Sequence, residues 1–326
     1  MNDALSEARL KLAIVTPVFN DWGPLEQLLV DLDAHLKAEN VDVHVIAVDD
    51  GSLVPAPAAL MGSTRHAHLQ SLEILTLACN LGHQRAIAVA LADVATRKGF
   101  DVVIVMDCDG EDRPEAIPAL LAEHWKQPGA FIVAARAKRS EGALFTFNYA
   151  LYKFIFRLLT GKTILFGNFC LIPFGLLQRL VFMPSLWNHL AATLLFSRLP
   201  LLLVPTVRGT RYAGKSSMNL VSLTTHGLSA ISVFIDAVFT RLLFACLIII
   251  AVSALAAGSV IAIRLMTTLA TPGWATTLVT ALTIIALQAG LLVTCSAFLA
   301  LAGRSNIPVV PARCQDLFIA SRNRIY

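Results

Sequence analysis

Four acidic side chains follow an apolar run in the middle of this chain. Residues 101–106 (DVVIVM) are rich in β-branched types and show no alternation with polar residues, which is typical of a buried central strand. Four of the six positions directly after it are acidic: Asp107, Asp109, Glu111 and Asp112. Hard divalent cations prefer carboxylate oxygens, and ligands of open α/β sheets collect outside the carboxyl ends of the strands. The pattern predicts a Mg²⁺ or Mn²⁺ site that would in turn hold phosphates.

An acidic turn that caps a helix starting near Pro114 is the alternative interpretation of the same residues. For an isolated D-x-D it would be favoured. The position directly after a buried strand favours the cation site instead.

Strands alternate with helices over the first 136 residues. Helices are expected at 24–36, where leucine recurs at helical spacing, and at 84–97. The apolar runs that predict the other strands are residues 12–16, which Pro17 ends, 41–48, 72–77 and 131–134. Polar loops follow the strands, so the order predicts an α/β fold with a doubly wound, mostly parallel sheet and a site along one edge.

Composition points to a membrane. Of the 326 residues 56% are apolar and 15% charged, and nearly all of the apolar excess lies after Thr240. Residues 242–263 carry no charge and would form about 33 Å of helix, enough to cross a hydrocarbon core. A second uncharged run, 265–303, is interrupted at 271–273. We expect two transmembrane helices, at about 241–263 and 275–302, rather than two buried core helices.

Flanking charge predicts the orientation. No apolar stretch in the first twelve residues resembles a signal peptide, and arginines gather at 241 and after 303, with only Arg264 on the far side. Both ends are therefore expected in the cytoplasm, in a multi-pass protein of the inner (cytoplasmic) membrane whose catalytic domain faces the cytoplasm. The six cysteines show no C-x-x-C spacing, so we expect reduced thiols.

Aromatic and basic residues share the predicted helix 144–159, which carries Lys153 and Arg157 one turn apart. The mixture suits a helix on a membrane surface, although a core helix rich in aromatic residues is an alternative. A second helix, about 219–238, is expected to lead into the first span. The predicted organisation is a catalytic domain at 1–218, a juxtamembrane helix at 219–240, two spans at 241–303 and a cytoplasmic tail at 304–326.

Four motifs at strand ends stand in order along the chain: TPVFND at 16–21, VDDGS at 48–52, NLG at 80–82 and DCDGEDRP at 107–114. At this point the sequence resembles family 2 glycosyltransferases with the GT-A fold, in particular the polyprenyl-phosphate glycosyltransferases related to dolichol-phosphate mannose synthase. Each motif alone is weak, but the ordered set followed by two spans is specific. The resemblance covers residues 11 to about 303.

The resemblance implies roles for individual residues. The nucleotide-sugar pocket would contain Pro17, Phe19, Asp21 and Asp50, although 49–51 alone would be an ordinary turn. The metal and diphosphate site would contain Asp107, Cys108, Asp109 and Glu111, with Asp107, Asp109 and Glu111 as metal ligands. Arg136 ends the fifth strand where relatives place a basic residue near the diphosphate; a solvated arginine is the alternative.

Residues 208–217 (RGTRYAGKSS) resemble the R-x-x-G-x-S-K loop of these enzymes. Arg211 matches the family arginine and, with Asp107 and Asp109, would be catalytic. Ser217 falls where the family has lysine, and Lys215 is the basic residue here; both are expected near the diphosphate. A basic, glycine-rich patch on the membrane surface is the alternative interpretation of this loop. At 167–171 (GNFCL), Asn168 and Cys170 replace the acid and the arginine of a D-F-R-L motif.

The favoured function is an inverting transfer of a sugar from a nucleotide-sugar (a UDP- or GDP-sugar) to a membrane polyprenyl phosphate, with Lys153 and Arg157 binding the lipid phosphate. The expected cofactor is Mg²⁺ or Mn²⁺. The expected partners include membrane lipid and exclude nucleic acid, and a homo-oligomer is possible. The alternatives are a processive polysaccharide synthase, whose Q-x-x-R-W motif this chain lacks, and a non-catalytic membrane protein that binds a nucleotide-sugar.

Overall fold

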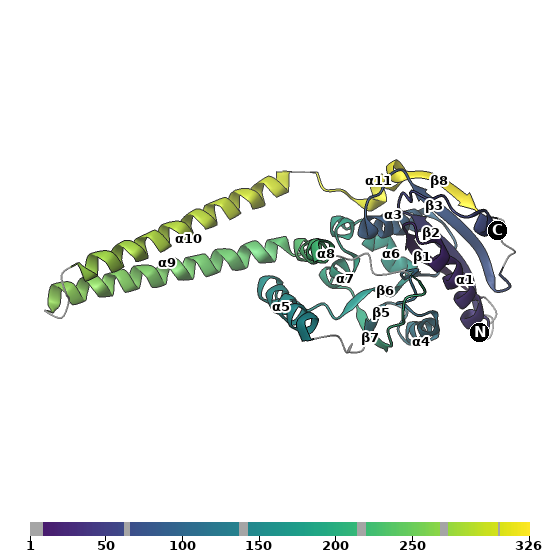
Figure 1. Cartoon of the computed structure of the whole chain (residues 1–326), viewed down its shortest axis with the longest axis horizontal. Coiled ribbons are helices and arrows are strands. Elements are labelled where there is room, and N and C mark those ends of the chain that lie inside the picture. The colour runs from purple at the N-terminus through teal and green to yellow at the C-terminus, as the bar shows by residue number, and fades with distance from the viewer. Residues whose placement is uncertain (1–8, 62–65, 137–142, 214–219, 268–272, 306) are drawn as a thin grey trace, which may run out of the picture. The chain divides into compact units, whose positions relative to one another are not determined.

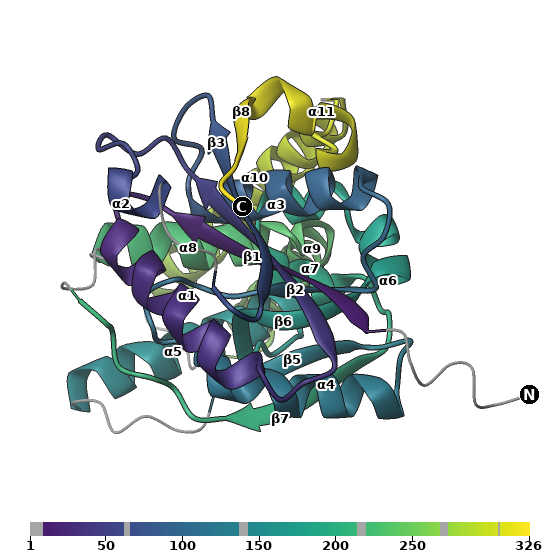
Figure 2. The same ribbon diagram turned by 90° about the vertical axis from the view of Figure 1, so that its right-hand side faces the viewer.

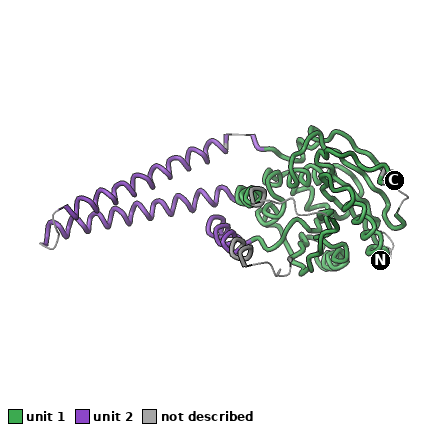
Figure 3. Tube along the Cα trace, viewed as in Figure 1, with its two compact units in different colours: residues 1–146, 164–233, 309–326 green, residues 147–163, 234–308 purple. Residues whose placement is uncertain are grey.

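The computed structural model of the chain describes residues 9–61, 66–136, 143–213, 220–267, 273–305 and 307–326 (Figure 1). The chain divides into two compact units (Figure 3). Unit 1 comprises residues 1–146, 164–233 and 309–326, and unit 2 comprises residues 147–163 and 234–308. The segment after the second long helix therefore belongs to the same unit as the N-terminal part of the chain.

Unit 1 is built on a single eight-stranded sheet with the order β7-β5-β6-β4-β1-β2-β3-β8. Its strands are β1 (Leu10–Val18), β2 (Val41–Asp49), β3 (Leu69–Leu77), β4 (Val102–Val105), β5 (Phe131–Arg136), β6 (Phe166–Pro173), β7 (Leu201–Thr206) and β8 (Ile319–Arg324). β6 and β8 run antiparallel to their neighbours, and the pairs among the other strands are parallel. The predicted mostly parallel α/β sheet is confirmed.

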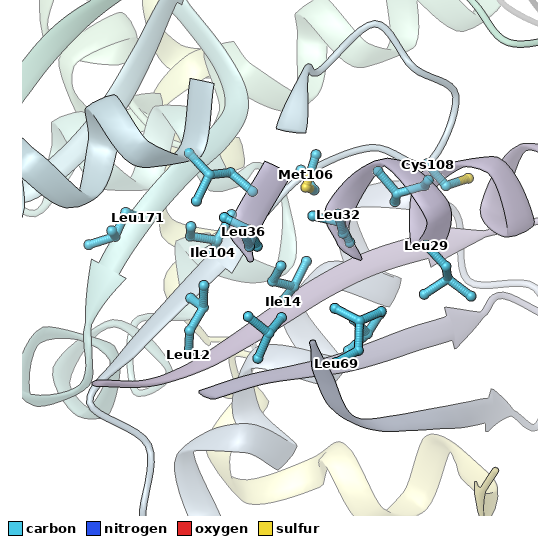
Figure 4. Close-up of a cluster of buried hydrophobic side chains, with 14 of the residues drawn as sticks. Leu12, Ile14, Leu29, Leu32, Leu36, Leu69, Ile104, Met106, Cys108 and Leu171 are labelled. Atoms are coloured by element: carbon cyan, nitrogen blue, oxygen red, sulfur yellow. The ribbon is translucent and has the colours of Figure 1, made fainter. Parts of the chain in front are cut away.

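Helices cover both faces of this sheet. α1 (Trp22–Leu36) and α4 (Ile117–Lys126) pack on one face, and Figure 2 shows both in front of the strands. α3 (His83–Thr96), α6 (Phe174–Leu180) and α7 (Leu190–Phe196) pack on the other. The leucines of α1 at helical spacing meet alternate residues of β1, such as Leu12 and Ile14, in the core of Figure 4. Each such side chain contributes about 1.5–3 kcal/mol on burial.

β1 continues through Pro17, which the sequence predicted to be its end. The main-chain oxygen of Val15 accepts from Met106 N–H on the β4 side, whereas that of Val18 accepts from Asp50 N–H on the β2 side. Because successive residues of a strand alternate, the nitrogen of Pro17 faces the β4 side. β4 ends at Val105, opposite Val15, so the pairing of β1 with β4 ends before Pro17.

The C-terminal segment completes the sheet. α11 (Pro311–Phe318) packs against α3, and β8 pairs with β3, where Arg322 binds the buried Asp93 at 2.8 Å. The segment that the sequence predicted only as a cytoplasmic tail thus forms an edge strand of unit 1. The chain leaves unit 1 after residue 233 and returns to it at residue 309. If the two long helices cross a membrane, the segments before and after them must therefore lie on the same side of it.

Unit 2 contains the two helices that the sequence predicted to be spans: α9 (Ile235–Met266) and α10 (Trp274–Ser305). Both are long and apolar enough to cross a membrane, and only 17% and 6% of their most apolar windows are buried. Within the described residues, neither helix is buried to the extent that a core helix would be. α5 (Ala143–Thr160) is the aromatic helix, and most of it belongs to this unit. α8 (Leu220–Ser232) ends before α9 begins, so the expected helix 219–238 is interrupted at 233–234.

Two histidines join α7 to α8 within unit 1. His189 precedes α7, and its buried Nδ1 accepts from Ala192 N–H at 3.4 Å. Its Nε2 must then carry the proton and donate to Nε2 of His226, 3.1 Å away. Burial, together with the neighbouring His226, lowers the pKa of His189 to about 3.

We expect this histidine to make unit 1 less stable in acid. In the unfolded chain His189 binds a proton below about pH 6.5, whereas in the folded protein it stays neutral until about pH 3, so its contribution to stability is lost as the pH falls from 6.5. His189→Asn keeps an oxygen that can cap α7 but does not titrate. The free energy of unfolding of the wild type, relative to this variant, should fall by about 2 kcal/mol between pH 7 and pH 5. Chemical denaturation in detergent at both pH values measures it, and parallel profiles would contradict it.

Candidate active site

The candidate site lies where four parallel strands end together. β3, β2, β1 and β4 are neighbours in the sheet, so their carboxyl ends and the loops that follow share one edge. The chain order reverses between β1 and β4, since β2 and β3 extend from one side of β1 and β4 lies on the other. Such a switch point is where open α/β sheets bind ligands.

The loops after β1 and β2 are joined through Asn20, which adopts the left-handed conformation (φ 58°). Its main-chain N–H donates to Ser52 Oγ at 2.9 Å, and its Oδ1 accepts from Leu53 N–H at 2.9 Å. The flanking Phe19 and Asp21 remain exposed. Phe19 and Asp21, two of the predicted pocket residues, are thus accessible on a loop that the hydrogen bonds of Asn20 hold in place.

Asp50 fixes the loop after β3. Only 3% of it is exposed, and its two carboxylate oxygens accept from Leu81 N–H at 2.7 Å and Gly82 N–H at 3.0 Å. Burial raises the pKa of Asp50, although these two hydrogen bonds oppose the shift. Gly51 is required beside it, because φ is +71° and a Cβ there would lie 2.7 Å from the main-chain nitrogen of Asn80.

The acidic turn after β4 is held by its own carboxylates. Asp112 Oδ2 accepts from Asp107 N–H at 3.0 Å, and Asp109 Oδ1 accepts from Glu111 N–H at 2.9 Å. These bonds order the turn itself but do not cap a helix, because the helical turn Pro114–Ala116 that follows has Arg113 as its N-cap residue and receives no side-chain cap bond. The outward oxygens of Asp109 and Glu111 face two arginines from the segment after β7.

Those arginines are Arg208 and Arg211. Arg211 Nη2 lies 2.5 Å from Asp109 Oδ2, its Nε lies 3.5 Å from Glu111 Oε1, and Arg208 forms an ion pair with Glu111. The structure thus brings the predicted Arg211 to the predicted acids. Glu111, expected as a metal ligand, forms its ion pair with Arg208.

His83, which the sequence did not single out, contacts the remaining acid. Its Nε2 lies 3.3 Å from Asp107 Oδ1, and its side chain is 42% exposed. Partial burial alone would lower its pKa, but Asp107, with Asp112 and Asp50, raises the pKa above the ordinary value. Its place at the first position of a helix after a strand-end loop was the signal that could have identified it.

A chain of amides reaches His83 from α7. Leu190 N–H donates to Gln84 Oε1 at 2.7 Å, and Gln84 Nε2 donates to Asn168 Oδ1 at 3.1 Å. Since a main-chain N–H can only donate, both amides are fixed in orientation, and Asn168 must present its N–H₂ to His83 Nε2, 2.9 Å away. This bond needs an Nε2 without a proton, so it forms with neutral His83, whereas the ion pair with Asp107 forms when Nε2 is protonated.

Comparisons with known proteins agree with the order of these loops. The family model for Glycosyl transferase family 2 matches residues 13–180, just over half of the chain. This chain belongs to glycosyl transferase family 2. Its mixed, mostly parallel sheet followed by two long apolar helices is the GT-A-like architecture that the sequence predicted.

Two curated relatives are similar to part of this chain. It is 35% identical over 134 residues to the undecaprenyl-phosphate 4-deoxy-4-formamido-L-arabinose transferase of Pseudomonas fluorescens, covering 41% of this chain and 37% of that protein. The corresponding transferase of Yersinia pestis is 29% identical over 142 residues, covering 44% of this chain and 41% of that protein. The aligned part thus spans about two fifths of the length of these relatives.

Among solved structures, glucosyl-3-phosphoglycerate synthase from Mycobacterium tuberculosis, in complex with Mn²⁺, UDP-glucose and phosphoglyceric acid, is similar at 17% sequence identity and a TM-score of 0.49. The similarity covers 71% of this chain and 81% of that chain.

The other predicted site residues of this glycosyltransferase lie in several places. The side chain of Cys108 is buried in the core beside α1 (Figure 4), where burial and the nearby acids raise its pKa, so only its main chain could contact a nucleotide-sugar. Pro17 is buried in β1, and Arg136 is the last residue of β5. Lys215 and Ser217 lie outside the described residues. Lys153 and Arg157 are on α5 in unit 2.

We expect Asp50 and its neighbour Asp49 to respond differently to the loss of charge. An asparagine at 50 would face one of its two N–H donors with an amide nitrogen, whereas Asp49 accepts one bond, from Ser52 N–H at 2.8 Å, which an amide oxygen can replace. Asp50→Asn should lower the free energy of unfolding by about 1–3 kcal/mol, and Asp49→Asn by much less. Denaturant titration of both variants measures the difference, and equal losses would show that the two bonds do not order this loop.

Proposed function

We propose that this chain is an inverting glycosyltransferase that moves a sugar from a nucleotide-sugar to a polyprenyl phosphate in the membrane. The observation that supports it most is the convergence of Asp50, Asp107, Asp109 and Arg211 at one sheet edge, in a chain that also carries two helices suited to a membrane. The curated relatives named above are transferases to undecaprenyl phosphate, which agrees with this acceptor.

The donor would bind along the ends of β1, β2 and β4. Phe19 and Asp21 are exposed at the β1 end, where an aromatic ring and a carboxylate can contact a base or a ribose. Asp50 holds the neighbouring loops, and each of its oxygens retains a second lone pair. Arg208 and Arg211 supply positive charge for the diphosphate.

Asp107 and Asp109 would hold a divalent cation together with oxygens of the diphosphate. Within the described part of the chain, no three His, Cys, Asp or Glu side chains come close enough together to hold an ion. Two carboxylates completed by substrate phosphates are, however, a usual Mg²⁺ or Mn²⁺ environment, and the donor chemistry fits. When bound, the cation would offset the charge that develops on the departing diphosphate. Arg211 would then turn from Asp109 toward the same phosphates.

The acceptor explains why no side-chain base is required. The second pKa of a phosphate monoester is about 6, so at neutral pH its oxygen is already anionic and needs only to be placed in line with the anomeric carbon. Cations near the lipid surface would bind this phosphate, and we assign this role to Lys153 and Arg157 on α5.

α5 also has the surface for contact with lipid. Leu151, Phe154, Ile155 and Leu158, at helical spacing, are all exposed. The helix is tied to the beginning of α9, where Phe156 packs edge-on against Phe234 and Arg241 donates to the Leu158 carbonyl at 2.9 Å. An exposed apolar stripe beside a membrane-spanning helix favours an interfacial position for α5. β8 lies in the same unit as the active site, and the arginines that flank the two long helices favour the cytoplasmic side for both.

Asp109→Asn should abolish transfer while leaving the fold intact. The amide oxygen can still accept from Glu111 N–H, but one anionic ligand for the cation is lost, and the rate should fall by at least about a hundredfold. Glu123→Gln, which removes a carboxylate from the far end of α4, is the matched control. Transfer rates measured at limiting Mn²⁺ test this, and near-normal activity of Asp109→Asn would refute the assignment of the cation.

The product identifies the reaction. Membranes containing the wild type, incubated with labelled UDP- and GDP-sugars, should yield label in the organic phase as a polyprenyl-linked monosaccharide with inverted anomeric configuration. Asp109→Asn membranes should yield none. Label that stays in the aqueous phase, or in a polymer, would favour a different acceptor or a processive synthase.

A further inference from the structure

The segment Arg208–Tyr212 is docked on the acidic turn by its main chain as well as by its arginines. Gly209 N–H donates to the Glu111 carbonyl and Tyr212 N–H to the Asp109 carbonyl, both at 2.9 Å. These two bonds span the turn between its two acids. They place Arg211, one residue before Tyr212, directly over Asp109.

The side chain of Tyr212 adds two further anchors. Its ring lies against Gly110, since a Cβ built on that glycine would be 2.9 Å from three of the ring carbons. Its hydroxyl donates to Asp31 Oδ2 on α1 at 2.6 Å. Burial, together with this bond, raises the pKa of Tyr212, so the hydroxyl remains a donor at neutral pH. The ring also packs partly against the core beneath α1.

We propose that Tyr212 is a positioning residue that holds Arg211 in place before the nucleotide diphosphate binds, through its bond to Asp31 and its contact with Gly110. The proposal rests on the proposed function only for the identity of the ligand. The segment 208–212 is already ordered in the free protein. Binding of the diphosphate therefore does not have to include the loss of conformational entropy that ordering this segment costs. Without the anchor, a fraction of molecules holds Arg211 elsewhere, and the apparent affinity falls by that fraction.

This role predicts a particular kinetic pattern. Once the diphosphate is bound, its charge orders the segment in either protein, so kcat should change little. Tyr212→Phe removes one hydrogen bond to a charged acceptor and should raise KM for the nucleotide-sugar, and Kd for the nucleoside diphosphate, by about three- to tenfold. Arg211→Ala, in contrast, should lower kcat as well. Tyr326→Phe is the matched control, because it removes a hydroxyl from the same unit without touching the turn.

Asp31→Ala should reproduce the effect from the other side of the bond. If both substitutions break one interaction, the double variant should be no worse than either single variant, which a double-mutant cycle measures. Thermal unfolding of all variants shows whether a general loss of stability is the cause instead. Such a loss would raise KM and Kd in Tyr326→Phe as well, or would raise them in proportion to the fall in melting temperature.

A second measurement requires no ligand. Arg208 and Arg211 are trypsin sites, so cleavage after them in the full-length protein, identified by mass spectrometry, reports how often the segment leaves the turn. We expect cleavage about three- to tenfold faster in Tyr212→Phe and Asp31→Ala than in the wild type. Unchanged cleavage would overturn the anchor, and faster cleavage with unchanged affinity for UDP and GDP would overturn its role in binding. If the wild type bound neither nucleotide, the proposed function would fail, while cleavage would still decide the anchor.

Discussion

Mutual repulsion among carboxylates at one edge of the sheet is the constraint on which the rest of this structure depends. Like charges held close together raise the free energy of the folded state unless something offsets them. The chain uses a different device for each acid: two main-chain N–H groups for Asp50, the imidazole of His83 for Asp107, and arginines for Asp109 and Glu111. In the proposed reaction a divalent cation would take over part of this role for Asp107 and Asp109, which would leave Arg211 available for the diphosphate.

Apolar runs predicted the first five strands, and with them the edge on which the acids meet, because burial on both faces leaves a clear pattern in the sequence. β8 left no such pattern: its sequence, IASRNR, is polar, and its pairing depends on β3 offering a free edge and on Asp93 binding Arg322. The contact of Asn168 with His83 crosses 85 residues, and no local spacing encodes it. Motif order thus predicted which residues share the edge, but not the bonds that hold them there.

The departures from the family pattern at 168 and 170 become intelligible in the folded chain. Asn168 accepts from Gln84 and presents its N–H₂ to His83, which the carboxylate of the family motif could not do. Cys170 is fully buried in β6 among apolar side chains, where an arginine would have to be desolvated. Asn168 thus connects His83 to Gln84 through hydrogen bonds, whereas Cys170 packs in the apolar core.

In the proposed reaction a lipid phosphate, already anionic, attacks without a side-chain base. This can be measured with the purified protein in lipid vesicles, supplied with one nucleotide-sugar and with either a polyprenyl phosphate or the polyprenol of the same chain length. Transfer should occur to the phosphate and not above background to the alcohol, whose hydroxyl has no base to take its proton. Transfer to the alcohol at a comparable rate would contradict it.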